Sequence, residues 1–348
     1  MTVLSLGLRL IVVPAERQRR AVAAIESLGG RVEYEEPDQE PFLLRWLPRD
    51  YFDVVREVNL NSTQATDAEL AHLHGLTGLQ ELDLFGTNIT DAGLAHLQGL
   101  TALEELSLCG TQVTDVGLVH LHGLMGLREL NLVRTQVTGA GLAHLEGLTG
   151  LQKLYIEPQA LGAGLAHLQG LTGLHELNLR GTQVTDAGLA HLQGLKGLRW
   201  LNLDDTQVTD AGLPQLHGLT GLQSLFLNGT QVTDAGLVHL HGITGLRGVF
   251  VAGTHVTDAG LAQLHGLTEL EWLSLYGLQV TDAGLANLQE LTGLQHLSLA
   301  HTQLTDAGLA HMHGLTKLQS VDLTGTQVTY NGVAKLREAL PKCQIFAP

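Results

Sequence analysis

The chain repeats one 24-residue segment along most of its length. LHELNLRGTQVTDAGLAHLQGLKG at 174–197 is followed directly by LRWLNLDDTQVTDAGLPQLHGLTG at 198–221. Twelve such repeats run from 55 to 341, and each has 24 residues except the fifth, which has 23. A fixed period of this length is typical of chains that stack one structural unit on the next around a continuous core. The 348 residues therefore predict one elongated domain rather than two or three globular ones.

The consensus of the repeat, LxxLxLxGTQVTDAGLAHLxGLTG, predicts a strand followed by a helix. Leucines at positions 4 and 6 alternate with polar residues, as in a strand with one buried face. Asp at position 13 can cap a helix, leucines at 16 and 19 share one side of it, and Gly at 21 can end it. We expect each repeat to be a short strand, a turn, a two-turn α-helix and a return. Strands stack about 4.8 Å apart and helices about 8–10 Å apart, so the stack should curve with a parallel sheet on its concave face and the helices on its convex face.

Two features of the repeat allow sharper expectations. Thr occupies position 9 in ten of the twelve repeats, where its hydroxyl can bond backbone groups of the turn that leaves the strand. The fifth repeat reads LQKLYIEPQALGAGLAHLQG and lacks both this Thr and the Asp of position 13. Because Pro158 also removes a backbone donor there, we expect a kink or bulge at 156–163.

The motif LxxLxLxxT resembles the leucine-rich-repeat signature, with Thr where that family usually has Asn. The 24-residue length and TDAGLAHL are similar to a bacterial subclass related to the ribonuclease-inhibitor-like, cysteine-containing and GALA-type repeats. The resemblance implies an α/β leucine-rich-repeat solenoid, a horseshoe that binds other proteins, and it does not name the partner.

The ends of the chain break the period and are expected to cap the solenoid. Residues 1–54 predict an N-terminal cap, with a helix stopped by Gly29 and Gly30, a strand RVEYE, and a hydrophobic shoulder. The shoulder carries Phe42, Trp46, Tyr51 and Phe52. The repeats then occupy 55–341 and end in a lengthened helix. A cap strand at 342–348 offers Ile345 and Phe346 to close the core.

The first 14 residues contain an apolar run that Arg9 interrupts. The run is shorter than the roughly 20 residues that a bilayer requires, and it lacks the basic start and small-residue cleavage site of a signal peptide. We expect a strand or helix packed on the cap. The alternative is the remnant of a membrane anchor, in which case the protein binds a membrane through a segment missing from this chain.

Charge and cysteine content limit the partners and the compartment. The 19 Lys and Arg against 35 Asp and Glu give a net charge of −16, so phosphate backbones would be repelled and nucleic acid is not an expected partner. The two cysteines, Cys109 and Cys343, give no disulfide framework or metal knuckle. The cysteine content favours the cytoplasm, with an exported or membrane-anchored bacterial protein as the alternative. We expect a monomer, because caps at both ends discourage edge-to-edge polymerisation.

Candidate binding residues are those at strand positions that the leucine core does not dictate. Seven aromatic residues occupy positions 3, 5 or 7, and most should therefore lie on the concave face: Phe85, Tyr155, Trp200, Phe226, Phe250, Trp272 and Tyr276. The last five come from repeats 7 to 10 and predict one apolar patch, since Trp and Tyr are frequent anchors at interfaces. The alternative is that these rings only shield the sheet.

Position 3 predicts a column of carboxylates in the first half of the chain, formed by Glu57, Glu81, Glu105 and Glu129. Like charges on adjacent strands repel, so a basic segment of a partner is one explanation for the column. The alternative is a soluble filler residue copied as the repeats multiplied.

Catalytic and metal signatures are missing from the sequence. It has no phosphate loop, no HExxH, no GxSxG and no CxxC pair, and 14 of its 18 histidines sit at helix positions 18 or 20, which predicts a solvated stripe. We therefore expect a noncatalytic scaffold, without cofactor or metal, that binds a protein or peptide with basic and apolar segments. Two alternatives are a ubiquitin-ligase adaptor, because LPRDYFDVV at 47–55 weakly resembles the opening of an F-box, and a carbohydrate-binding module that uses the aromatic row.

Overall fold

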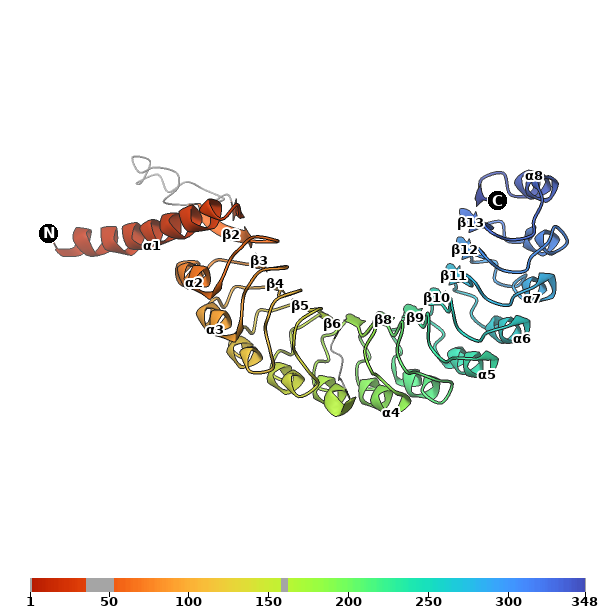
Figure 1. Cartoon of the computed structure of the whole chain (residues 1–348), viewed down its shortest axis with the longest axis horizontal. Coiled ribbons are helices and arrows are strands. Elements are labelled where there is room, and N and C mark those ends of the chain that lie inside the picture. The colour runs from red at the N-terminus through yellow and green to blue at the C-terminus, as the bar shows by residue number, and fades with distance from the viewer. Residues whose placement is uncertain (1, 36–52, 158–161, 348) are drawn as a thin grey trace. The chain divides into compact units, whose positions relative to one another are not determined.

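The computed structural model describes residues 2–35, 53–157 and 162–347, with side chains from Val13 onward. The chain forms two compact units, Met1–Pro158 and Gln159–Pro348, called here the N-terminal block and the C-terminal block. In each block the strands lie side by side and the short helices lie on one side of them (Figure 1). The predicted combination of a parallel sheet with short helices is thus confirmed.

Nearly every repeat contributes one strand of three or four residues, and the strands follow chain order within each block. In the N-terminal block they are β1 Arg31–Glu35, β2 Val54–Asn59, β3 Glu81–Asp83, β4 Glu105–Ser107, β5 Glu129–Leu132 and β6 Lys153–Ile156. In the C-terminal block they are β7 Glu176–Asn178, β8 Trp200–Asn202, β9 Ser224–Phe226, β10 Gly248–Phe250, β11 Trp272–Ser274, β12 His296–Ser298, β13 Ser320–Asp322 and β14 Gln344–Phe346. Only β1 is antiparallel to its neighbour, β2, among the strand pairs described within the blocks.

The helices of the repeats are shorter and tighter than the predicted two-turn α-helices. The α-helices are α1 Thr2–Ser27, α2 Asp67–Leu70, α3 Asp91–Leu94, α4 Asp186–Leu189, α5 Asp234–Leu237, α6 Asp258–Leu261, α7 Asp282–Ala286 and α8 Tyr330–Ala339. The 3-10 helices are η3 Ala71–Gly75, η4 Ala95–Leu97, η5 Gly117–Leu121, η6 Gly141–Leu145, η7 Gly162–Leu168, η8 Ala190–Leu192, η9 Leu213–Gly218, η10 Val238–Gly242, η11 Ala262–Leu264 and η12 Gly308–Met312. Most repeats thus hold one α-turn that continues as 3-10, or a 3-10 helix alone. Because only about eight residues are available per repeat, the 3-10 form, which is used in short pieces, competes well there.

The core consists of the apolar positions of the consensus. In repeat 9 none of the seven is more than 1 % exposed: Leu246, Val249, Val251, Val256, Leu261, Leu264 and Leu267. The strand residues on either side of position 4 point to the other face of the sheet, which we call the open sheet face. This face holds the side chains at positions 3 and 5, and its residues are mostly half-buried or exposed.

The predicted role of Thr at position 9 is confirmed in all ten repeats that have it. Each hydroxyl donates to the carbonyl oxygen of the residue at position 6, at 2.6–2.7 Å. The side chain therefore fixes the turn that leaves the strand.

The Asp at position 13 is not the helix cap that the sequence predicts. The capping residue is Thr at position 12, as at Thr257, whose hydroxyl accepts from the backbone N–H of Ala259. Asp instead accepts two hydrogen bonds from the capping Thr of the next repeat. Asp234, for example, accepts from Thr257 N at 2.7 Å and from Thr257 Oγ1 at 2.7 Å. All nine aspartates at this position do the same: Asp67, Asp91, Asp115, Asp186, Asp210, Asp234, Asp258, Asp282 and Asp306.

This ladder of Asp–Thr bonds explains the Gly at position 15 of the following repeat. A Cβ atom on Gly260 would overlap Asp234 Oδ1, and the same clash recurs wherever the preceding repeat supplies an Asp. Gly188 follows repeat 5, which has no such Asp, and a Cβ there would meet only side-chain methyl groups, Leu165 Cδ1 at 3.0 Å and Val184 Cγ1 at 3.8 Å. Glycine is thus required by its neighbouring repeat rather than by its own helix.

The N-terminal cap consists of α1 and β1. The helix ends before Gly29, which has φ of 83°, and it buries Ala21 and Ile25 at 1 % and 3 % exposure. The side chain of Gln18 donates to Asp53 O at 2.6 Å, so the helix holds the start of the first repeat strand. The predicted helix end and strand RVEYE are confirmed. None of the helices in the described part of the chain is long and apolar enough to cross a membrane.

Two sequence predictions at the cap and at repeat 5 lie outside the described residues. These are the shoulder formed by Phe42, Trp46, Tyr51 and Phe52, and most of the bulge expected at 156–163.

At the C-terminus, α8 is lengthened to ten residues as predicted, and β14 pairs with β13. Ile345 is buried at 9 % exposure, but Phe346 is 47 % exposed, so the prediction that both residues close the core is wrong for Phe346. Successive residues of a strand face opposite ways, so burying Ile345 places Phe346 on the open sheet face.

Candidate functional site

The five aromatic residues predicted as a patch all belong to the C-terminal block, on the open sheet face or at its edge. Trp200 begins β8, Phe226 and Phe250 end β9 and β10, and Trp272 begins β11. The first three are half-buried, whereas Trp272 is 45 % exposed and Tyr276, which follows β11, is 49 % exposed. The leucine core lies on the other side of the sheet, so none of these rings fills it.

The rings form separate stacks rather than one continuous patch. Trp200 lies 4.9 Å from Phe226 between ring centroids, and Phe226 stacks parallel to Phe250 at 4.2 Å. Trp272 stacks on His296 at 3.6 Å, and Tyr276 meets His301 edge-on at 5.1 Å. The sequence analysis missed both histidines.

A groove of about 410 Å³ runs over β10 to β14 on this face. Its lining consists of Phe250, Trp272, Leu273, Ser274, His296, Leu297, Ser298, Ser320, Asp322 and Phe346. Three aromatic rings, three serines and one carboxylate thus share one concavity. The strand register could have indicated His296, which pairs with Trp272 at the same repeat position.

His296 is held on both sides within the groove. Its Nδ1 lies 2.8 Å from Ser320 Oγ, and its ring covers one face of Trp272. Partial burial lowers the pKa of His296 below its ordinary value, and the nearby carboxylate of Glu271 opposes this shift only in part. The imidazole is therefore mainly neutral at pH 7.

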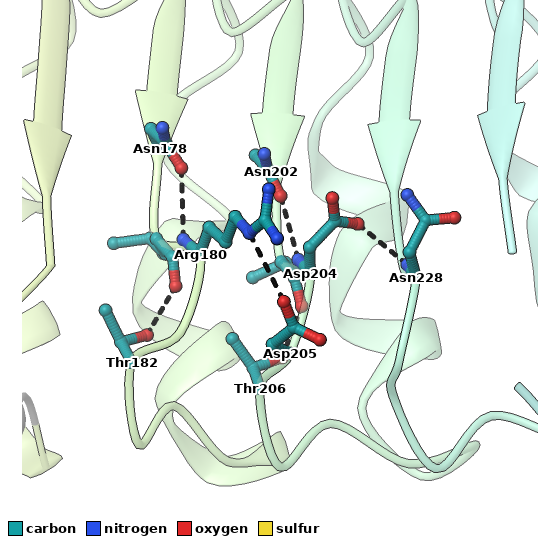
Figure 2. Close-up of polar contacts among 10 residues, drawn as sticks. Asn178, Arg180, Thr182, Asn202, Asp204, Asp205, Thr206 and Asn228 are labelled. Atoms are coloured by element: carbon teal, nitrogen blue, oxygen red, sulfur yellow. Dashed lines mark hydrogen bonds and ion pairs between the residues drawn. The ribbon is translucent and has the colours of Figure 1, made fainter. Parts of the chain in front are cut away.

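At the ends of β7 to β9, polar side chains satisfy the turn N–H groups in two ways (Figure 2). Asn178 and Asn202, at position 5, each accept from the N–H two residues later, at 3.0 and 2.8 Å. Repeats 8 and 9 have Phe at position 5 and lack this acceptor. There the preceding repeat supplies it, because Asp204 accepts from Asn228 N and Asn228 Oδ1 accepts from Ala252 N, both at 2.7 Å.

Asp204 is a buried carboxylate, 7 % exposed, that the sequence analysis did not single out. Burial raises its pKa, and the hydrogen bonds with Asn228 oppose the shift. Arg180 instead pairs with the neighbouring Asp205, with Nε 3.2 Å from Oδ2, as Figure 2 shows. Asp204 is the acceptor for the N–H of Asn228, which has no acceptor in its own turn because Phe226 occupies position 5.

Phe85 and Tyr155, the other two predicted aromatic contacts, belong to the N-terminal block. Phe85 is 37 % exposed and follows β3, and Tyr155 is half-buried in β6. Neither belongs to the groove.

The N-terminal block carries the predicted column of carboxylates. Adjacent strands pair Glu57 with Glu81, Glu81 with Glu105, and Glu105 with Glu129. The column is one residue longer than predicted, because β1 pairs Glu33 with Glu57. A shallow hollow of about 300 Å³ lies over the column.

Two of these carboxylates have bonded cations and two have raised pKa values. Arg56 lies 3.0 Å from Glu81, and Lys153 lies 2.9 Å from Glu129. Desolvation by burial raises the pKa of Glu57, with repulsion from Glu33 and Glu81 adding to it. Desolvation also raises the pKa of Glu105, and Glu129 and Glu81 add repulsion. The column thus alternates between neutralised and repelled carboxylates.

The helix-side histidines approach one another more closely than the spacing of helix axes suggests. His241 and His265, equivalent residues of adjacent repeats, have ring centroids 4.9 Å apart. Across residues 2–35, 53–157 and 162–347 no group of three His, Cys, Asp or Glu side chains could hold a metal ion.

The repeats match a family model and several solved structures. A model described as Leucine Rich repeat matches 76–97, 171–192, 291–310 and 314–336. Comparison with curated proteins gives no significant match.

An internalin of Listeria monocytogenes is 22% identical with a TM-score of 0.60, over 85% of this chain and 90% of the internalin. A leucine-rich-repeat protein of Leptospira interrogans is 23% identical with a TM-score of 0.64, over 86% of this chain and 74% of that protein. A plant peptide hormone receptor, solved in complex with RGF2, is 16% identical with a TM-score of 0.50, over 84% of this chain and 55% of the receptor. These likenesses show the fold, and they leave the predicted repeat subclass a prediction. The chain therefore folds as a leucine-rich-repeat solenoid.

Proposed function

We propose that this protein is a noncatalytic binding scaffold that holds a protein or peptide on the open sheet face of its C-terminal block. The observation that carries the proposal is the pair of ring stacks, Trp200–Phe226–Phe250 and Trp272–His296, on the face opposite the leucine core. Exposed aromatic side chains bury large areas on binding at little entropic cost. The leucine-rich-repeat fold, which typically binds proteins, supports the same proposal.

The alternative of a carbohydrate platform has less support. A sugar ring packs on an open aromatic face, and here Phe226 and Phe250 stack face to face while His296 covers one face of Trp272. Six of the nine residues of the F-box-like segment LPRDYFDVV, 47–52, lie outside the described residues, so no contact supports an adaptor role.

The test is selection from a random 12-residue peptide library displayed on phage. The full chain should enrich peptides that the Trp200→Ala/Trp272→Ala double variant does not hold, with an unchanged circular dichroism spectrum. Tyr330→Ala is the control, because Tyr330 is 82 % exposed and starts helix α8 rather than lying in a strand. Equal enrichment by the double variant would contradict the proposal. Loss of the spectrum would show that the rings shield the sheet instead.

A further inference from the structure

The register of β10 to β14 places one row of side chains along the groove at position 5. The row reads Phe250, Ser274, Ser298, Asp322 and Phe346, each paired with the next on the adjacent strand. Two aromatic rings therefore stand at the ends of a floor made of three small side chains. At about 4.8 Å per strand the row is roughly 19 Å long, which suits an extended peptide lying across the strands.

Asp322 is the one carboxylate among the residues that line the groove. Its Oδ1 accepts a hydrogen bond from Thr324 N at 3.0 Å. Within the described part of the chain its Oδ2 has no hydrogen-bond partner, and the lining includes no Lys or Arg. Asp322 can therefore accept a cation from outside.

Phe346 supplies the second half of a cation site. It is the strand partner of Asp322 and is 47 % exposed. An aromatic face beside a carboxylate favours a cationic side chain, because the ring attracts the charge and the carboxylate pairs with it. A ligand that covered Asp322 with apolar groups alone would bury an unpaired charge, which is costly.

We propose that the groove binds an extended peptide through an arginine or lysine side chain. The cationic group lies between Asp322 and Phe346, and the neighbouring apolar part of the peptide packs on Trp272 and Phe250. Arginine is favoured over lysine because its planar guanidinium can both stack on the ring and pair with the carboxylate. The net charge of −16 draws such a ligand toward the chain. This inference rests on the proposed function and specifies its ligand.

The experiment uses peptides that the full chain selects from the phage library, synthesised with arginine and with the neutral isostere citrulline. Citrulline should weaken binding about tenfold, the size expected for one charge-assisted hydrogen bond. Asp322→Asn should weaken the arginine peptide equally and remove the difference between the two peptides. The variant keeps the Oδ1 acceptor for Thr324, so the turn is preserved.

Asp83→Asn is the matched control. Asp83 occupies the same repeat position and makes the same bond, from Phe85 N at 2.9 Å, but it lies in the N-terminal block. It should leave both affinities unchanged. If Asp322→Asn loses its thermal transition, Phe346→Leu replaces it and should weaken the arginine peptide more than the citrulline peptide.

The results distinguish a failure of the cation site from a failure of the proposed scaffold function. Peptides that need Trp200 and Trp272 but bind equally with arginine or citrulline would refute the cation site and leave the scaffold function standing. A chain that enriches no peptide would refute both. Selected arginine peptides that ignore Asp322→Asn would also overturn the inference.

Discussion

Replacing Gly260 with Ala tests whether the Asp–Thr ladder dictates glycine at position 15. A Cβ on Gly260 would overlap Asp234 Oδ1 and lie 3.0 Å from Val256 Cγ1. If the carboxylate stays, the overpacking costs about 1–3 kcal/mol. If it moves, it loses hydrogen bonds to Thr257 that are worth roughly 1.5–3 kcal/mol each. Alanine returns about 1 kcal/mol of helix propensity. The cheaper of the two responses sets the cost, so we expect a net loss of up to about 2 kcal/mol in the free energy of unfolding.

The ladder makes a stronger prediction for the double variant. Asp234→Ala removes the oxygen that the new methyl group would strike, so Gly260→Ala should then cost nothing or stabilise slightly. The coupling energy of the cycle should be about 1–3 kcal/mol, the range found for residues in contact. Gly188→Ala is the matched control, because its new methyl group would meet side-chain methyl groups of Leu165 and Val184 and no carboxylate.

Urea unfolding followed by circular dichroism measures all four chains and the control, with the midpoint compared at a common slope. The reasoning is refuted if Gly260→Ala costs no more than Gly188→Ala. It is also refuted if its cost is unchanged in the Asp234→Ala background, since the glycine would then serve its own helix.

Two further predictions concern pH and charge. The folded-state pKa values of Glu57 and Glu105 are raised, so their contribution to stability is greatest below the unfolded pKa and falls as pH rises through the folded pKa. Glu57→Gln or Glu105→Gln should therefore add about 0.2–1 kcal/mol to the free energy of unfolding at pH 7. Glu81→Gln should not, because it loses the ion pair with Arg56. The folded-state pKa of His296 is lowered, so its contribution to stability is present above the unfolded pKa and is lost as pH falls through the folded pKa. His296→Phe should therefore reduce the fall in the free energy of unfolding between pH 7 and 5, measured by urea titration.

The fold was largely predictable because the same apolar core positions recur in twelve repeats. Alternating leucines indicated the strands, and Thr at position 9 indicated its own turn bond. The role of Asp at position 13 was not predictable from capping rules, because those rules consider only neighbours within one helix. Its partners, such as Thr257 for Asp234, lie 23 residues away in the next repeat.

The aromatic residues of the site were predictable as deviations from the consensus, but their companions were not. His296 and His301 occupy positions 3 and 8, outside the helix positions that hold 14 of the 18 histidines, and the sequence analysis assigned them no role. Phe346 was assigned to the core because the phase of the last strand, fixed by Ile345, becomes visible only once β14 pairs with β13.

The aromatic stack depends on changes elsewhere in the sheet. In the preceding repeat, Asn202 at position 5 accepts a hydrogen bond from the turn N–H. Phe226 occupies the same position and cannot accept one, so the buried Asp204 accepts from the N–H of Asn228 instead. Keeping a desolvated carboxylate to satisfy a turn is unfavourable for a purely structural repeat, which would simply retain Asn at position 5. The pair therefore supports the proposal that Phe226 contacts a partner.

This dependence is testable by a cycle at the two positions. Asp204→Ala should cost about 1–3 kcal/mol, because the N–H of Asn228 loses its acceptor. Phe226→Asn restores an acceptor within the same turn, so it should recover about 1 kcal/mol in the Asp204→Ala background. In the wild-type chain that N–H already has a partner, so the same change should bring no gain there and should weaken peptide capture. An equal change in the free energy of unfolding on Phe226→Asn in both backgrounds, measured by urea unfolding, would show that the burial of Asp204 does not depend on Phe226.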